Sequence, residues 1–233
     1  AMTETAQNPK DHLLDAALMH VPFDGWSDTT FQAAIADTGI DSTVANAVCP
    51  RGSVDLAVAY HKRGDALMID RMTSEDLTEM KYRDKIAAMV RFRLEVVTDK
   101  EVVRRGTTLF ALPQHAGDDA KLVWGTCDAI WDALGDTSDD VNWYTKRATL
   151  SAVYSSTVLY WLGDTSDGHQ ATWEFLDRRI DNVMQIEKVK AQVRNSPTLS
   201  KLMTGPNWLL SHVKAPSRAP KMGLPGSWTS PRR

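Results

Sequence analysis

Apolar residues recur at intervals of three and four along nearly the whole chain, whereas strict alternation of apolar and polar residues is confined to short runs. The first pattern is typical of amphipathic helices and the second of strands, so the chain is expected to be all-α. Glycines, prolines and capping residues separate the periodic segments and predict about nine or ten helices. These helices are expected over residues 9–21, 28–36, 42–48, 53–70, 75–97, 99–111, 118–134, 140–162, 168–195 and 197–213.

The pentapeptide Gly-Asp-Thr-Ser-Asp occurs twice, at 135–139 and at 163–167, each time between two predicted helices. The glycine is expected to end one helix, and the hydroxyl or carboxylate to cap the next. Because the flanking sequences do not match, capping explains the pair better than an ancient duplication. The chain is accordingly divided into an N-terminal helix-turn-helix-like module (9–52), ligand-binding and dimerisation helices (53–195), an amphipathic helix (197–213) and a flexible basic tail (215–233).

Length and composition exclude two classes of protein. The 233 residues are 42% hydrophobic, which is enough for a full core, and no apolar run approaches the length of a membrane span. Transmembrane and wholly disordered chains are therefore excluded. Cys49 and Cys127 lie far apart in a chain without an apolar secretory segment, so we expect reduced thiols and a cytoplasmic protein rather than a disulfide framework.

The net charge of −3 conceals a strong asymmetry, because residues 1–50 carry −6, residues 51–182 carry −5 and residues 183–233 carry +8. The first 50 residues have the outline of a helix-turn-helix DNA-binding module. The segment in the position of its recognition helix, 41–48, contains one acid and no base. Since nonspecific DNA affinity comes from neutralising phosphates, this pattern predicts a vestigial helix-turn-helix that has no DNA function.

Catalytic signatures are missing from the sequence, which has no phosphate-binding glycine loop, no zinc-protease motif and no nucleophile elbow. The six histidines are scattered and do not pair with another His, Cys or Glu at helical spacing. We therefore expect no enzyme activity, no catalytic residue, no metal site and no resident cofactor beyond a bound lipid.

Several short motifs carry a family resemblance over roughly residues 11–213. They are Leu13-Leu-Asp-Ala-Ala17, Gly25-Trp26, Leu112-Pro113, Asp128-Ala-Ile-Trp131, Gly135-Asp136, Asn142-Trp-Tyr-Thr-Lys-Arg147, Trp173, Phe175-Leu176 and Arg179. With these motifs the chain resembles the lipid-binding accessory proteins of coenzyme Q (ubiquinone) biosynthesis, the family of the ninth coenzyme Q protein. The resemblance implies a TetR-repressor-like all-helical fold, usually a homodimer, which has lost DNA binding and holds a lipid or isoprenoid. It also implies that the protein presents a quinone precursor to demethoxyubiquinone hydroxylase at the membrane.

Three sets of candidate residues follow. The lipid-binding set is Trp143, Leu150, Tyr154, Val158 and Trp161, of which the last four share one face of the apolar helix 140–162. By the resemblance, the surface that meets the hydroxylase maps onto Leu112, Pro113 and Trp131. The membrane-binding set is Leu199, Leu202, Met203, Trp208, Leu209 and Leu210, an apolar stripe next to the basic tail. Core packing is the alternative for the tryptophans, and packing on the domain is the alternative for the stripe.

The expected location also follows from charge. A mitochondrial presequence is basic and poor in acids, whereas this N-terminus is acidic, so we expect a protein peripheral to the bacterial inner membrane. The anionic membrane surface would attract the basic tail. The alternative function, from a different class, is a TetR-type transcriptional regulator that binds an apolar effector.

Overall fold

The computed structural model describes residues 7–202 and 210–216, and within these residues it contains helices and no strand. The all-α prediction is therefore confirmed for the described part of the chain. The helices are α1 (Pro9–Ala17), α2 (Val21–Asp24), α3 (Asp28–Thr38), α4 (Ser42–Val48), α5 (Ser53–Ser74), α6 (Tyr82–Glu95), α7 (Lys100–Phe110), η1 (Pro113–His115), α8 (Ala116–Ala133), α9 (Val141–Gly163), η2 (Asp167–His169), α10 (Gln170–Asn195) and α11 (Pro197–Leu202).

Two predicted helices are shorter in the structure than the periodicity indicates. The segment expected at 9–21 divides into α1 and α2, and Pro22 lies in the first turn of α2, where its missing N–H costs nothing. The helix expected from residue 75 starts only at Tyr82. Asp76 instead accepts a hydrogen bond from the Thr78 backbone N–H at 3.1 Å, a local turn that competes with helix formation.

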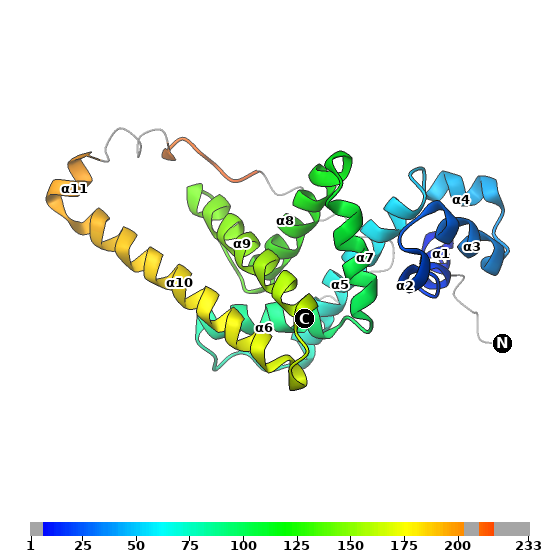
Figure 1. Ribbon diagram of the computed structural model, residues 1–233. Helices are drawn as coiled ribbons and strands as arrows, with labels where there is room; N and C mark the ends of the chain where they lie inside the picture. The colour runs from blue at the N-terminus through cyan, green and yellow to red at the C-terminus, as the bar shows by residue number, and fades with distance from the viewer. Residues whose placement is uncertain (1–6, 203–209, 217–233) are drawn as a thin grey trace, which may run out of the picture.

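The molecule is elongated, with α1–α4 at one end, α5–α9 in the middle and α10 projecting at the other end (Figure 1). Two apolar clusters hold it together. The first joins α1, α3 and α4 to residues of α5, α7 and α8, including Leu56, Val102 and Leu122. The second joins α5, α6, α8, α9 and α10 around Met89, Ile130 and Leu176. Helices α5, α7 and α8 therefore connect the N-terminal helices to the central bundle.

The two copies of the pentapeptide begin alike and then differ. Asp136 and Asp164 accept hydrogen bonds from the backbone N–H groups of Ser138 and Ser166, at 3.3 and 2.7 Å. Asp164 also accepts from the Thr172 N–H in the first turn of α10, so the second copy is a cap, as expected. In the first copy the cap of α9 is Asp140, whereas the Asp136 carboxylate is 2% exposed and ion-paired inside the protein.

The two cysteines are free and buried, one in each apolar cluster. Burial raises the pKa of the Cys127 thiol to about 12. Over the described residues, no helix is both long enough and apolar enough to span a membrane.

Candidate functional site

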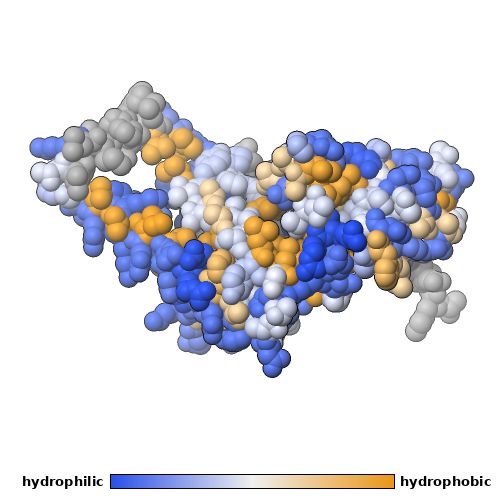
Figure 2. All heavy atoms as spheres, in the orientation of Figure 1, coloured by the Kyte–Doolittle hydropathy of each residue, from blue (hydrophilic) through white to orange (hydrophobic). Residues whose placement is uncertain are grey.

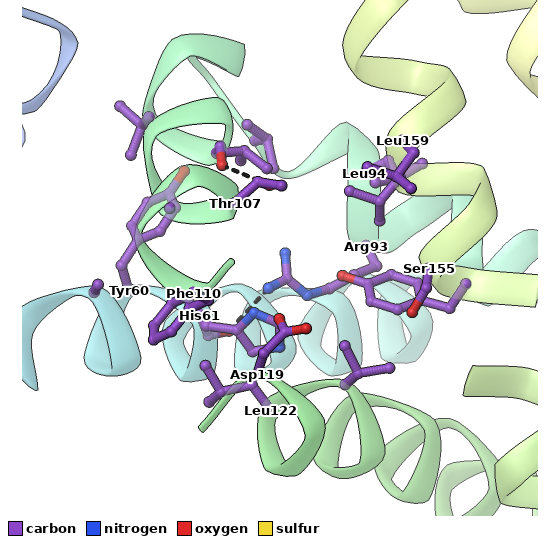
Figure 3. A pocket seen from close by; sticks show the side chains of 18 of the residues that line it. Tyr60, His61, Arg93, Leu94, Thr107, Phe110, Asp119, Leu122, Ser155 and Leu159 are labelled. Carbon is purple, nitrogen blue, oxygen red and sulfur yellow. Dashed lines mark hydrogen bonds between the residues drawn. The ribbon is translucent and has the colours of Figure 1, made fainter. Parts of the chain in front are cut away.

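A cavity of about 200 Å³ lies between α5, α6, α7, α8 and α9 (Figure 3). Three of the five residues predicted to bind lipid, Tyr154, Val158 and Trp161, line this cavity from one face of α9. Its walls are largely apolar and include Trp26, Leu94, Val97, Val102, Val103, Phe110, Leu122, Val123 and Leu159. An apolar pocket with a few polar groups is the usual form of a small-molecule site.

The polar groups form one connected network at the base of the cavity. The Arg93 side chain, 6% exposed, donates from Nε to Asp65 at 2.9 Å and from Nη2 to the His61 carbonyl oxygen at 2.9 Å. The Thr126 hydroxyl donates to Asp65 at 2.7 Å and lies 2.8 Å from Nε2 of His61. Because Asp65 takes the threonine proton, Nε2 of His61 is assigned as the donor to Thr126. The network therefore links α5, α6 and α8 below the cavity.

Two titratable groups of this network have shifted pKa values. Burial, together with the positive charge of Arg93, lowers the pKa of His61 to about 4, so the imidazole is neutral at physiological pH. Burial also raises the pKa of the Tyr154 phenol, which therefore keeps its hydroxyl proton. At neutral pH the cavity thus presents neutral His61 and Tyr154 side chains beside the Arg93–Asp65 ion pair and the Asp119 carboxylate.

Gly64 lets Arg93 reach this position. A Cβ added to Gly64 would lie 2.3 Å from Nη1 of Arg93, closer than atoms can approach without displacement. Pairs of His, Cys or Glu at helical spacing do not reveal this network, because the side-chain partners of His61 and Arg93 are Thr126 and Asp65. One sequence signal could have indicated it, namely a glycine, Gly64, inside a predicted helix. It stands between His61 and Asp65, which are four positions apart and therefore lie on one face of the helix.

The other two predicted lipid-binding residues lie outside this cavity. The Trp143 ring covers the Arg147 guanidinium at 4.1 Å and packs 6.0 Å from the Trp124 ring. Arg147 is completely buried and pairs with Asp128 at 2.6 Å and Asp136 at 2.9 Å. Trp143 is therefore part of a charged cluster at the start of α9.

Leu150 lines a second hollow between α6, α8, α9 and α10, with a volume of about 260 Å³. Its apolar lining is Ile86, Trp131, Leu150, Val153, Ile180, Val183 and Met184. Leu150 and Tyr154 are one turn apart on α9 but line different hollows. The five residues predicted to bind lipid therefore do not form one site.

The predicted partner-binding residues are also separated. Leu112 is 43% exposed and Pro113 is exposed beside it, immediately before α8. Trp131 lies near the other end of α8, about 23 Å along the helix axis. Its ring is 8% exposed, and its indole N–H donates to the Lys146 carbonyl oxygen at 3.1 Å. Leu112 and Pro113 are thus available on the surface, whereas Trp131 packs mainly inside.

The predicted membrane-binding stripe lies almost entirely outside the described residues. Met203, Trp208 and Leu209 fall there, as do the side chains of Leu199 and Leu202. Leu210 is 45% exposed. The residues after it return to the bundle, since the Ala215 N–H donates to the Asp139 carbonyl oxygen at 2.7 Å. The Tyr144 hydroxyl donates to the Lys214 carbonyl oxygen at 3.2 Å.

Apolar side chains are exposed on α9 and on the projecting part of α10 (Figure 2). They include Leu159, 61% exposed, together with Ile186 and Val189 at 55% and 58%. At the opposite end of the molecule, the helix in the recognition position, α4, carries no basic residue and has Val44 exposed. The helix in the recognition position therefore offers no basic side chain to DNA phosphates.

Comparison with known proteins places these features in context. The COQ9 family model matches residues 116–187, which cover α8, α9 and most of α10. The chain is 34% identical over 185 residues to the mitochondrial ubiquinone biosynthesis protein COQ9 of Drosophila melanogaster, covering 77% of this chain and 56% of that protein. It is 26% identical over 204 residues to the human COQ9 protein, covering 83% of this chain and 63% of that protein. The chain thus spans less than two thirds of these relatives.

A solved structure supports the predicted fold. The TetR transcriptional regulator from Nitrosomonas europaea superposes with a TM-score of 0.61 at 17% sequence identity, over 74% of this chain and 95% of that chain. At this identity the likeness concerns the fold alone. The TetR-like all-helical fold predicted from the sequence is confirmed.

Proposed function

The chain is related to the COQ9 family of ubiquinone biosynthesis proteins, and we propose that it is a noncatalytic accessory protein that binds a lipid or isoprenoid quinone precursor. The observation that carries this proposal is the cavity beneath α9, which has mostly apolar walls and a hydrogen-bonding base. Each methylene buried there contributes about 0.8 kcal/mol, so an isoprenoid tail needs no charged ligand group. The relatives that match most of the chain are named as ubiquinone biosynthesis proteins, which supports a precursor of that pathway as the ligand.

Native mass spectrometry of the purified protein, followed by organic extraction, tests this proposal. We expect a copurifying isoprenoid or phospholipid that is released when the protein unfolds. A variant with Val158→Asp places a charge on the cavity wall and should copurify without lipid, whereas Lys62→Asp on the outside of α5 should retain it. Lipid-free wild-type protein that also fails to take up added isoprenoid quinone would contradict the proposal.

The proposal includes delivery of the ligand to demethoxyubiquinone hydroxylase at an anionic membrane. The exposed Leu112 and Pro113 are proposed to contact the hydroxylase, and the apolar stripe around 199–210 with the basic tail is proposed to contact the membrane. We also propose that the protein works at the cytoplasmic face of a bacterial inner membrane, whose anionic surface would attract the basic tail. The matched relatives are named as mitochondrial proteins. Leu112→Glu should weaken copurification of the hydroxylase without changing lipid content.

The alternative function is a transcriptional regulator, which the TetR-like fold by itself permits. The acidic N-terminal segment and the base-free α4 weigh against it. Titration of the purified protein with duplex DNA at physiological salt separates the two functions. We expect only weak, nonspecific association, and tight sequence-selective binding would favour the regulator.

A further inference from the structure

The cavity contains a cationic side chain with one donor nitrogen that the described residues leave without a partner. Arg93 has five N–H bonds, and its Nε and Nη2 are committed to Asp65 and the His61 carbonyl oxygen. Among the described residues, no acceptor lies within hydrogen-bonding distance of its Nη1, although the residue is only 5% exposed. Figure 3 shows this terminal nitrogen directed into the open part of the pocket. This nitrogen is accessible from the hollow of the cavity, so a bound molecule or water can accept its hydrogen bond.

The acidic and imidazole side chains of the cavity and the leucines of α6 and α9 lie on different sides. Figure 3 shows His61 and Asp119 on one side, beside Phe110 and Leu122, and Leu94 and Leu159 on the other, near Ser155. Leu159 is 61% exposed, so its side of the cavity leads to solvent. A molecule with one polar end and one apolar end would therefore enter with its polar end first, and its tail would leave past Leu159.

The charges around Arg93 favour a neutral polar end over an anionic one. Asp65 already pairs with the guanidinium, and the Asp119 carboxylate also lines the cavity. Arg93 is the only Lys or Arg among the residues described as lining the cavity. A carboxylate or phosphate group would be repelled by Asp65 and Asp119, and the one cation near it, Arg93, is already paired. A neutral carbonyl or ether oxygen would need only the unpaired N–H of Arg93.

We propose that Arg93 is a specificity-determining residue that donates from Nη1 to a neutral oxygen on the head group of the bound molecule, as in a quinone ring carrying an apolar tail. The inference rests on the proposed lipid-binding function and adds the orientation and the head-group chemistry. The Tyr154 hydroxyl, which lines the same cavity and has no hydrogen-bond partner among the described residues, provides a second donor for the same head group.

Binding of three probes with similar tails tests the proposal: decylubiquinone, decylbenzene and decanoate. We expect the wild-type protein to prefer decylubiquinone to the other two in calorimetric titrations. Arg93→Lys keeps a positive charge beside Asp65 but loses the Nη1 donor. It should weaken decylubiquinone binding by about tenfold or more and leave decylbenzene binding unchanged. Arg91→Lys, on the same helix but outside the cavity, is the matched control.

The outcomes separate this inference from the proposed function. If all probes bind equally well to the wild type and to Arg93→Lys, or if decanoate binds best, the assignment to Arg93 is wrong while lipid binding stands. If no probe binds to the wild type, the proposed function and the inference both fail. A second measurement needs no variant, because the infrared carbonyl bands of bound decylubiquinone should move to lower wavenumber than in hexane. Unshifted bands would exclude the hydrogen bond.

Discussion

Two arginines, Arg93 and Arg147, are almost completely buried, and each is held by carboxylates from other segments of the chain. Arginine is suited to such sites because its guanidinium is always charged and offers five donors in a fixed plane. Burial by itself raises the pKa of Asp136, but hydrogen bonds from Lys146, Arg147 and Ser138 outweigh it and hold the pKa well below its usual range. Both arginines therefore depend on partners that remain ionised.

Asp136→Asn is expected to lower the free energy of unfolding by about 3–5 kcal/mol, because it removes the buried carboxylate that pairs with Arg147 and leaves the guanidinium only its half-exposed partner Asp128. Asp128→Asn is the matched control. Its carboxylate contacts the same guanidinium at 2.6 Å but is 47% exposed, so the expected loss is about 1 kcal/mol or less. Urea unfolding followed by circular dichroism measures both. Equal losses would show that burial of Asp136 does not determine its contribution.

His61 should make stability depend on pH in the acid range. Its pKa is about 4 in the folded protein and about 6.5 when unfolded, so the unfolded state binds the proton first as the pH falls. Between pH 7 and pH 5 this difference should cost about 2 kcal/mol of stability, and the loss continues toward pH 4. In His61→Gln, which keeps a donor for Thr126, the fall over this range should be smaller by that amount. An unchanged pH dependence would contradict the assignment.

At the scale of the helix, Gly64 of α5 leaves room for the Arg93 side chain of α6. A glycine in the middle of a helix costs about 1 kcal/mol relative to alanine, so the residue needs a compensating reason. The reason is the close approach of the Arg93 side chain from α6, which leaves no room for a Cβ. The ion pair with Asp65 then joins the two helices below the cavity.

Gly64→Ala should therefore destabilise the protein in spite of the better helix propensity, and should weaken binding in the cavity by displacing Arg93. The two effects separate in a double-mutant cycle measured by thermal unfolding. In an Arg93→Ala background the guanidinium is gone, and Gly64→Ala should cost less or become stabilising. Equal effects in both backgrounds would mean that the close approach is unimportant.

The exposed apolar face of α10 is proposed to form the homodimer together with α9. Ile186 and Val189 lie three positions apart on one side of the helix and are more than half exposed. Ile186→Glu should weaken the dimer by about tenfold or more, since it places a charge in an apolar contact. Gln185→Glu adds the same charge at the neighbouring position and should have little effect. Sedimentation velocity measures both, and a monomeric wild type would contradict the proposal.

At the scale of the whole molecule, opposite charges are placed at opposite ends of the chain. Residues 1–50 carry −6 and include α1–α4 at one end of the elongated fold. Of the nine bases of residues 183–233, four lie on α10 and α11 at the other end, namely Lys188, Lys190, Arg194 and Lys201. The acidic end opposes contact with nucleic acid or an anionic membrane, while the basic end favours the membrane. This polarity would orient the molecule on a membrane with α1–α4 facing away.

Truncation after Arg194 removes six Lys or Arg and no acid, along with the whole apolar stripe. We expect the truncated protein to keep its helical circular dichroism but to lose flotation with anionic liposomes. The full chain should lose flotation as salt is raised, because the attraction is screened. Undiminished flotation of the truncated protein would show that the membrane contact lies elsewhere.

The sequence by itself determined the local features, because periodicity and capping act between residues that are close along the chain. These features include the all-α class and most helix bounds, whereas the TetR-like arrangement was implied by the family resemblance. The sequence did not determine which α9 residues share a cavity, since one helical face from Leu150 to Trp161 meets two different hollows.

Only the tertiary structure brought together Arg93, Asp65, His61 and Gly64, which come from two helices and are supported by Thr126 from a third. Each of these residues is unremarkable in its own segment. Burial makes the difference, because a charge removed from water requires a partner, and the choice of partner depends on helix packing that spacing along the chain does not encode.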